Sequence, residues 1–347
     1  MADTLAALPG PRHPDPADAL PLRWGVLGPG AIAAGFTDAL HRHTRQRVVA
    51  AGSRSAERAR AFAAAHGVER SYGSYEALVA DPEVEVVYVA TPHSEHLAHA
   101  LLAIAAGKHV LIEKPMAVTA DQSRRIVEAA RAAGVFAMEA MWTRYLPQTD
   151  IVRQLLADGA LGEVRLVTAD FGGRSRYDPA SRLWHPALAG GALLDLGVYL
   201  VSWSSFAIGP PAGIVATGTL APTGVDDQVA LVLSSAHGAQ ALLSTTLLAS
   251  TPSLATISGS AGRIETDSPF WGPSGLRVFD SDGTLLSHWR DPYGRPHRDG
   301  MAYEAAALAR YVAEGRSESP LHPLAEAVDT LATIDEARRQ VGATRVE

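Results

Sequence analysis

A charged pair at the end of a strand pattern is the feature of this chain that most suggests chemistry. The apolar segment from His109 to Ile112 runs directly into Glu113, Lys114 and Pro115. Open α/β sheets bind their ligands outside the carboxyl ends of parallel strands. The pattern therefore predicts that Lys114 lies at the reactive end of a ligand site.

A glycine-rich turn near the start of the chain supplies a second part of this site. The strand pattern of residues 23–27 leads into residues 28–33, Gly-Pro-Gly-Ala-Ile-Ala, which fit G-x-G-x-x-G/A. Gly28 would permit the tight turn, Gly30 the approach of a pyrophosphate, and Ala33 close packing of the next helix. The residues expected to contact the cofactor there are Gly28, Gly30, Ala31 and Ile32. A dinucleotide turn combined with a reactive lysine is the arrangement of a redox enzyme.

The end of the second strand indicates which dinucleotide is bound. An NAD site usually has Asp or Glu about 20 residues after the turn, where it holds the ribose 2′-hydroxyl. This chain instead has residues 50–54, Ala-Ala-Gly-Ser-Arg, with Arg58 one helical turn after Arg54. Guanidinium groups suit a 2′-phosphate, so Ser53, Arg54 and Arg58 favour NADP(H) over NAD(H). The alternative is two solvated arginines on a surface helix.

Composition limits the class of protein. A length of 347 residues favours two domains, and a hydrophobic content of 47% excludes a disordered chain. The net charge of −7, without a basic block, argues against nucleic acid as a partner. The absence of Cys removes disulfides, thiolate chemistry and Cys-based zinc sites.

The first 21 residues are predicted to form a flexible tail. They are rich in Ala, Asp and Pro and lack a basic segment followed by an apolar one, so they do not resemble a secretory signal. We find no apolar run as long as a membrane span. A cytoplasmic protein without a membrane partner is the expectation.

Residues 22–141 are predicted to form one α/β domain with a doubly wound parallel sheet. Short apolar runs alternate there with Ala-rich helical stretches, which implies right-handed crossovers between parallel strands. The predicted strands are residues 23–27, 48–51, 84–90, 109–112 and 135–138, and the predicted helices are residues 31–43, 55–66, 93–106 and 119–133.

Residues 142–347 are predicted to form an α+β domain with a large, mostly antiparallel sheet. Its predicted strands are residues 163–171, 214–220, 228–234, 239–248, 255–258 and 263–266, the last two joined by a hairpin-like turn. An antiparallel sheet can leave one face open, and an open apolar face often forms a dimer. A final helix over residues 324–341 is expected to pack back on the core.

Several motifs together resemble the Gfo/Idh/MocA oxidoreductase family over most of residues 22–343. They are Gly28-Pro29-Gly30, residues 91–96 (TPHSEH), residues 107–110 (GKHV) and Glu113-Lys114-Pro115. Residues 139–145 (EAMWTRY) and 190–199 (GGALLDLGVY) are similar to the branch of dimeric dihydrodiol dehydrogenases and NADP-dependent D-xylose or D-glucose 1-dehydrogenases.

The resemblance implies a Rossmann domain followed by a domain whose open sheet forms a homodimer or homotetramer. It also implies that Lys114, Asp195 and Tyr199 meet at the nicotinamide as catalytic residues, and that the Lys114–Pro115 bond is cis. The further cofactor contacts it implies are Thr91, Pro92, His93, His96 and Glu113. His93 stands where the wider family commonly has Asn.

The chemistry of these residue types agrees with that role. Asp195 and Tyr199 are four residues apart and share a face if they lie on an α-helix. A phenol titrates near pKa 10, and an adjacent ammonium such as that of Lys114 stabilises the phenolate. Tyr199 is therefore a candidate general acid or base, and Asp195 could orient the substrate hydroxyl or the lysine. The alternatives are a half-buried tyrosine and a solvated carboxylate.

Other candidates have weaker support. His96 and His99 lack a third ligand nearby, so no metal is predicted. The residues proposed to line the substrate pocket, with ordinary packing as the alternative, are Trp142, Arg144, Tyr145, Trp184 and His185.

These observations predict an NADP(H)-dependent dehydrogenase for a cyclic sugar or diol, with an aldopyranose oxidised at its anomeric carbon first and a trans-dihydrodiol second. Three alternatives stay open. They are a ketosugar reductase of nucleotide-sugar biosynthesis, an NAD-dependent glycosidase on the same fold, and a non-enzymatic NADP sensor.

Overall fold

The structure, a computed structural model, describes residues 8–292, 294 and 297–344. It divides into two compact units. The Rossmann unit comprises Pro14–Tyr145 and Pro296–Val328, and the sheet unit comprises Met1–His13, Leu146–Arg295 and Asp329–Glu347. The sequence placed everything after residue 141 in the second domain. The structure differs because the helix α9 (Met301–Ala313) packs against α2 (Ala31–His43) of the Rossmann unit.

The Rossmann unit is built on a parallel sheet with the strand order β3-β2-β1-β4-β5-β6. Its strands are β1 Arg23–Leu27, β2 Arg47–Gly52, β3 Arg70–Tyr72, β4 Val86–Val89, β5 His109–Glu113 and β6 Ala137–Ala140. The four central strands are apolar and buried along nearly their whole length, as expected when helices cover both faces of a sheet. This order places the carboxyl ends of β1 and β4 side by side, where the strand order reverses and α/β sheets bind ligands.

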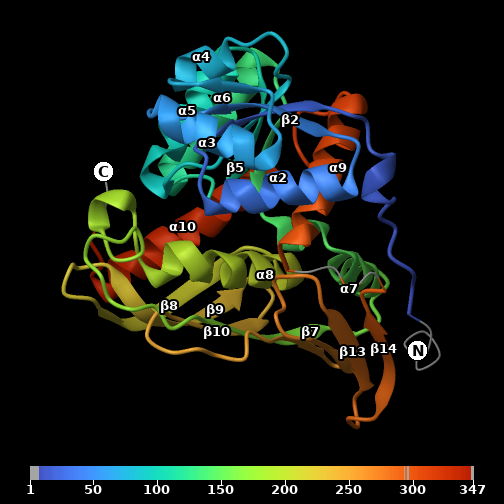
Figure 1. The fold of residues 1–347 in the computed structure, drawn as a ribbon. Helices are drawn as coiled ribbons and strands as arrows, with labels where there is room; N and C mark the ends of the chain where they lie inside the picture. Colours follow the sequence, from blue (N-terminus) through green and yellow to red (C-terminus); the bar gives the residue numbers. More distant parts are fainter. Residues whose placement is uncertain (1–7, 293, 295–296, 345–347) are drawn as a thin grey trace. The chain divides into compact units, whose positions relative to one another are not determined.

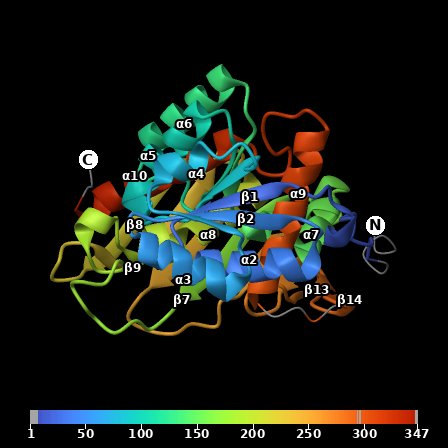
Figure 2. The same cartoon turned by 45° about the horizontal axis from the view of Figure 1, so that its top comes forward.

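Helices cover both faces of this sheet. They are α2, α3 Ala56–His66, α4 Tyr75–Val79, α5 His96–Ala105 and α6 Ala120–Ala133, preceded at α5 by the short η2 His93–Glu95. Figure 2 shows α2 and α3 on one face and α5 and α6 on the other. The expected doubly wound parallel sheet is confirmed.

The described part of the predicted tail, residues 8–21, makes specific contacts. The short helix η1 Pro16–Asp18 accepts a hydrogen bond at Ala17 O from Arg45 Nε (3.1 Å). In the sheet unit the Arg12 amide donates to Asp150 Oδ2 (2.8 Å). The expectation of a loose segment therefore does not hold for residues 8–21, and the rest of the predicted tail lies outside the described residues.

The sheet unit is built on a mixed sheet with the order β14-β13-β12-β11-β7-β10-β9-β8. Its strands are β7 Val164–Gly172, β8 Pro211–Leu220, β9 Asp226–Ser235, β10 Gln240–Thr246, β11 Ala255–Gly259, β12 Gly262–Thr266, β13 Gly275–Asp280 and β14 Leu285–Arg290. Only the β7–β10 pair is parallel among the described pairings. The predicted large, mostly antiparallel sheet and the β11–β12 hairpin are confirmed.

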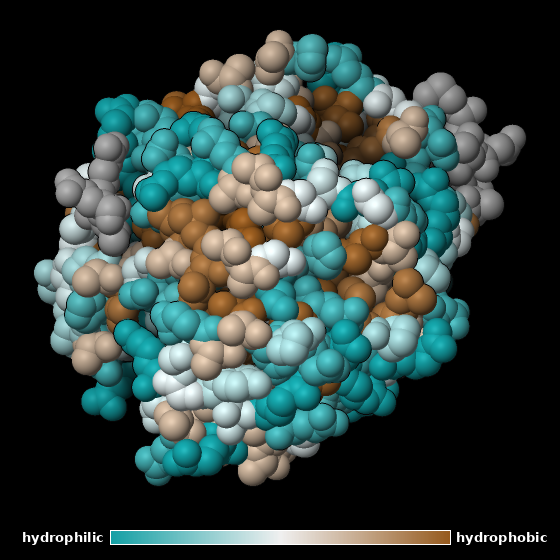
Figure 3. Space-filling model, turned by 90° about the horizontal axis from the view of Figure 1, so that it is seen from above, coloured by the Kyte–Doolittle hydropathy of each residue, from teal (hydrophilic) through white to brown (hydrophobic). Residues whose placement is uncertain are grey.

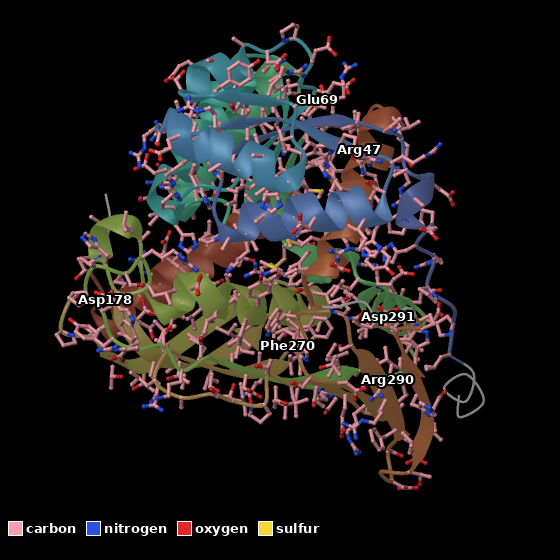
Figure 4. The ribbon with its side chains drawn as sticks, in the orientation of Figure 1. Arg47, Glu69, Asp178, Phe270, Arg290 and Asp291 are labelled. Atoms are coloured by element: carbon pink, nitrogen blue, oxygen red, sulfur yellow. The ribbon has the colours of Figure 1, made fainter. Side chains whose placement is uncertain are left out.

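Helices cover one face of this sheet. α7 Pro147–Ala157 and α8 Val198–Ile208 lie on that face in Figure 1, and the final helix α10 Leu324–Val341 has the predicted bounds. Phe270 is fully buried and lies between α8 and the sheet, with its ring 5.9 Å from Trp203 (Figure 4).

One stretch of the sheet unit is as long and as apolar as a membrane span, although none was expected from the sequence. Pro186–Ile208 contains an 18-residue window with a mean hydropathy of 1.4, and 78% of that window is buried inside the protein. The stretch contains α8, so burial in a protein core accounts for its hydrophobicity.

The opposite face of the mixed sheet is open, since no described helix of the sheet unit covers it in Figure 1. Val215, Val232 and Leu242 are register partners on β8, β9 and β10, and they are 63%, 37% and 44% exposed. Their neighbours on the other face, among them Leu231, Leu233 and Leu243, are buried. We call Val215, Val232 and Leu242 the apolar row. Apolar surface is not confined to it, because a hydrophobic band also crosses the view in Figure 3.

Candidate active site

The turn after β1 has the shape that a dinucleotide requires. Gly28 has φ of +93°, and a Cβ there would lie 2.7 Å from Thr91 Cγ2 and 3.0 Å from Ala90 O. Gly30 caps α2, and a Cβ at Gly30 would meet nothing within 4 Å. Ala33 is fully buried. Gly28 is therefore required by the fold, whereas Gly30 leaves open space at the positive end of a 13-residue helix, where a pyrophosphate fits.

The end of β2 carries the two predicted arginines. Ser55 accepts a hydrogen bond from the Arg58 amide (3.3 Å) and begins α3, so Arg54 and Arg58 lie at its first turn with exposed side chains. Neither forms an ion pair with a carboxylate in the part of the chain that the structure describes. Ser53 is buried and accepts from the Ser55 amide (3.2 Å).

Tyr75 lies beside these arginines and was not predicted from the sequence. Burial raises the pKa of its phenol, and the charges of Arg54 and Arg58 oppose that rise. Its ring meets the His99 ring edge-on at 4.5 Å, and His99 Nδ1 is 3.0 Å from Thr91 Oγ1. His99 thus belongs to the wall of this site, and the described residues contain no cluster of three His, Asp or Glu that could hold a metal ion.

His96 joins the loop after β4 to the loop after β5. It is fully buried, with Nε2 2.8 Å from Thr91 O and Nδ1 2.8 Å from Pro115 O. Both partners are carbonyl oxygens, which only accept hydrogen bonds. A neutral imidazole has one N–H and can donate to one of them, whereas a protonated imidazole can donate to both. Burial lowers the His96 pKa although the two carbonyls oppose that shift. His96 therefore fixes the spacing of the two loops, and the predicted Thr91, Pro92 and His93 follow β4 in one of them.

The loop after β5 holds Glu113 and Lys114. The Lys114–Pro115 bond is cis, as the resemblance implied. Glu113 is buried and accepts a hydrogen bond from the Tyr88 hydroxyl, while Lys114 is half-buried. Burial raises the Glu113 pKa, and the Lys114 charge is the largest influence that opposes this rise.

Two further buried carboxyl groups belong to the Rossmann unit, and the sequence did not indicate the role of either. Glu139 on β6 accepts a hydrogen bond from the Met116 amide (2.8 Å) through Oε1 and lies 2.7 Å from His322 Nε2 through Oε2. Glu304 on α9 is 1% exposed. Burial, followed by the charges of Glu113 and Glu139, raises the Glu304 pKa well above its usual value. Burial and the two neighbouring carboxylates therefore favour the protonated form of Glu304.

In the sheet unit, Asp195 and Tyr199 lie at the junction of two helices. Asp195 belongs to the π-helix η5 Leu193–Gly197, and Tyr199 belongs to the first turn of α8. The sequence treated both as members of one α-helix, whereas the π-turn changes the spacing between them. Each is 8% exposed. Arg182 donates to Asp195 Oδ1 (2.9 Å) and so orients this carboxylate.

Two aromatic residues hold the Tyr199 ring. Phe171 on β7 and Trp271 are stacked at 4.8 Å, and their ring centroids lie 5.7 Å and 5.8 Å from that of Tyr199. Neither these rings nor Arg182 belongs to a motif, and the two rings lie 28 and 72 residues from Tyr199 in the sequence. They could not be assigned before the fold was known.

The residues predicted to line a substrate pocket are mostly engaged in packing. Arg144 forms an ion pair with Glu326 (2.5 Å) and donates to Leu321 O (3.1 Å). Trp184 is 1% exposed, packs in a hydrophobic cluster and donates to Arg176 O (3.0 Å). Two others in the 3₁₀ turn with Arg144 are also buried, namely Trp142 and Tyr145. His185, which is half-buried, precedes the short helix η4 Pro186–Leu188.

The Rossmann sheet with its glycine-rich turn and the large mixed sheet, together with the comparisons below, define a class. The protein is a dehydrogenase or reductase that acts on CH–OH groups. Residues 22–141 match the oxidoreductase family with an NAD-binding Rossmann fold, and residues 150–265 match the GFO/IDH/MocA C-terminal domain. The chain belongs to the Gfo/Idh/MocA family.

Relatives extend over nearly the whole chain. The trans-1,2-dihydrobenzene-1,2-diol dehydrogenase of Macaca fascicularis is 39% identical over 328 residues, covering 93% of this chain and 98% of the relative. The Homo sapiens enzyme of that name is 38% identical over 337 residues, with the same coverage.

Solved structures show the same architecture. KijD10, a 3-ketoreductase from Actinomadura kijaniata in complex with NADP and TDP-benzene, is 28% identical with a TM-score of 0.80 over 93% of this chain and 98% of that one. The aldose-aldose oxidoreductase from Caulobacter crescentus, complexed with glycerol, is 25% identical with a TM-score of 0.82 over 92% and 97%.

Proposed function

We propose that this protein is a cytoplasmic NADP(H)-dependent dehydrogenase of ring CH–OH groups, with a trans-dihydrodiol as the first candidate substrate and an aldopyranose as the second. The order of substrates reverses the one drawn from the sequence, because relatives 38–39% identical over 93% of the chain are named for the dihydrodiol reaction. The observation that carries the cofactor preference is the end of β2, where exposed Arg54 and Arg58 replace the carboxylate of an NAD site.

We assign the cofactor to the residues at the carboxyl ends of β1, β2, β4 and β5. The open space at Gly30 and the α2 amides suit the pyrophosphate, and Arg54 with Arg58 suits a 2′-phosphate. The nicotinamide, when bound, supplies the hydride chemistry. The residues proposed to line its reactive end are Thr91, Pro92, His93, Glu113 and Lys114.

Proton transfer is assigned to Tyr199. Its phenolate accepts the proton of the substrate hydroxyl during oxidation, and the resulting phenol returns that proton during reduction. The Lys114 ammonium favours the phenolate form, and Asp195, held by Arg182, orients the substrate hydroxyl. The stacked pair of Phe171 and Trp271 restrains the Tyr199 ring, which limits the misplacement of the reacting oxygen.

The test is NADPH formation from NADP⁺ with trans-dihydrodiols, D-xylose and D-glucose, repeated with NAD⁺. We expect turnover with NADP⁺ that falls at least about 100-fold in Lys114→Met and in Tyr199→Phe, since each removes a group used in proton transfer. Turnover that is unchanged in both variants would reject the assigned residues.

A ketosugar reductase is the second candidate function. It is supported by the 28% identity and full-length likeness to the 3-ketoreductase solved with NADP and TDP-benzene. NADPH oxidation that occurs with a nucleotide-linked ketosugar, combined with no turnover of diols or aldoses, would favour this alternative.

A further inference from the structure

A buried carboxylate holds the beginning of the π-helix that carries Asp195. Asp226, at the start of β9, is 0% exposed, and its Oδ2 accepts a hydrogen bond of 2.6 Å from the Leu193 amide. Leu193 is the first residue of the π-helix. The first amides of a helix have no partner within it, so a carboxylate at this position satisfies one of them and complements the helix dipole.

The two glycines before this helix are explained by the same contacts. Gly191 has φ of +121°, and a Cβ there would lie 2.4 Å from Asp226 Oδ1. A Cβ at Gly190 would lie 2.6 Å from Leu183 O and 2.7 Å from Arg182 O. The Gly-Gly pair therefore lets the chain pass between Asp226 and the backbone that carries Arg182. Arg182 in turn pairs with Asp195.

The charged groups facing Asp226 are few. Burial raises its pKa to about 6, the Leu193 amide and the Arg338 charge on α10 oppose the rise, and the neighbouring Asp227 adds to it. Asp227 itself is bonded to a different partner, since its Oδ1 accepts from Thr219 Oγ1 (2.6 Å). The two adjacent aspartates thus have separate roles, which makes Asp227 a matched control.

We propose that Asp226 is a positioning residue for the reaction: through the Leu193 amide it fixes the π-helical turn that presents Asp195 and, one turn later, Tyr199. This inference rests on the proposed function only in assuming that Asp195 and Tyr199 act on the substrate. The hydrogen bond itself is testable without any turnover.

The first test follows the backbone amide of Leu193 by NMR in the full-length protein. In the wild type this amide resonance is expected to titrate with a midpoint near pH 6, because its acceptor changes from carboxylate to carboxylic acid. The titration should vanish in Asp226→Asn and persist in Asp227→Asn. A Leu193 amide shift that is the same in the wild type, in Asp226→Asn and in Asp226→Ala would show that Asp226 is not its hydrogen-bond acceptor and would overturn the proposal.

The second test separates positioning from stability. We expect Asp226→Ala to lower kcat about 10- to 100-fold, as misplacement of a reacting group does, with NADPH affinity unchanged because that site lies in the Rossmann unit. Asp226→Asn keeps an acceptor for the Leu193 amide and should restore most of kcat at pH 7.5, and Asp227→Asn should match the wild type. An Asp226→Ala enzyme with wild-type kcat overturns the proposal. Absence of turnover in the wild type would instead reject the proposed function, and the NMR titration would still decide the role of Asp226.

Discussion

Arg54 and Arg58 are two exposed cations at the tip of β2, where the chain has no carboxylate. Both guanidinium groups are exposed, so solvent screening reduces each contact with a phosphate to about 1 kcal/mol, and removing both should cost more than tenfold in affinity. We predict that Arg54→Ala/Arg58→Ala weakens NADPH binding by about 10- to 100-fold and leaves NADH binding unchanged, as measured by titration of nicotinamide fluorescence.

Arg60 provides the control for that prediction. It is exposed on the same helix, two residues after Arg58, and therefore projects from a different side. Arg60→Ala should bind NADPH like the wild type. Equal losses of NADPH and NADH affinity in the double variant would show that the arginines hold the pyrophosphate rather than a 2′-phosphate.

Glu304 offers a prediction about pH. Because its folded pKa lies well above the usual value, the folded state retains a proton that the unfolded state releases as the pH rises above about 4.5. The wild type should therefore lose stability with rising pH by up to about 1.4 kcal/mol per pH unit from this group. Glu304→Gln cannot lose this proton, so its stability lacks this dependence on pH. The free energy of unfolding of Glu304→Gln minus that of the wild type should therefore grow from pH 5 to pH 8.

Denaturant unfolding at several pH values measures this difference. Glu314→Gln is the control, since Glu314 follows the same helix α9 and is 41% exposed in its side chain. The free energy of unfolding of that variant should change with pH in the same way as that of the wild type. If the stability of Glu304→Gln also changes with pH in parallel with the wild type, the pKa of Glu304 is not raised in the folded protein and the prediction is wrong.

At the scale of elements, the two glycines of the turn between β1 and α2 have different roles: Gly28 is required by the fold, and Gly30 is required for binding. Gly28→Ala places a Cβ 2.7 Å from Thr91 Cγ2 at a φ of +93°, so we predict a loss of about 1–3 kcal/mol of stability as well as of NADPH binding. Gly30→Ala meets no protein atom and has a φ of −105°, so its melting temperature should stay close to that of the wild type.

The same Gly30→Ala variant should nevertheless bind NADPH at least about tenfold more weakly, because the added methyl group occupies the space left for the pyrophosphate. Differential scanning fluorimetry with and without NADPH measures both quantities in one experiment. A Gly30→Ala protein that NADPH stabilises as strongly as the wild type would place the pyrophosphate elsewhere.

Several elements with regular patterns were predicted from the sequence, whereas the helices α7 and α9, of 11 and 13 residues, were not. Residues 23–27 and 31–43 have the predicted bounds because an apolar run and an amphipathic helix meet there at an unambiguous turn. The elements β3 and α4, of three and five residues, were missed since they are too short to show a period. The strands β13 and β14 were missed too, and β14 is an edge strand of the mixed sheet.

The candidate site was predictable only where a motif carries it. Gly28, Lys114 and the cis bond belong to short contiguous patterns that have one structural interpretation. Glu304, by contrast, lies nearly two hundred residues after Glu113, and its pKa is raised by burial and then by the charges of Glu113 and Glu139. Such a contact depends on the chain reversal that brings α9 to the Rossmann unit, which local periodicity does not encode.

At the scale of the whole molecule, the open face of the mixed sheet leads to a prediction about assembly. Val215, Val232 and Leu242 expose adjacent apolar side chains on three paired strands, and a second copy of this chain presents the same row. A two-fold interface needs such a self-complementary patch. We predict a homodimer or homotetramer in solution through this face. Val232→Glu, at the centre of the row, should yield a smaller species in light scattering coupled to size-exclusion chromatography.

The mutation acts on assembly because two glutamates would be brought together in an apolar interface, where burying unpaired charges costs several kcal/mol. Leu20→Glu is the control, since Leu20 is 52% exposed and belongs to the Rossmann unit rather than to the mixed sheet. It should leave the mass unchanged. A Val232→Glu protein that keeps the oligomeric mass of the wild type, with the fold intact by circular dichroism, would exclude this face from the interface and leave the apolar row to another partner.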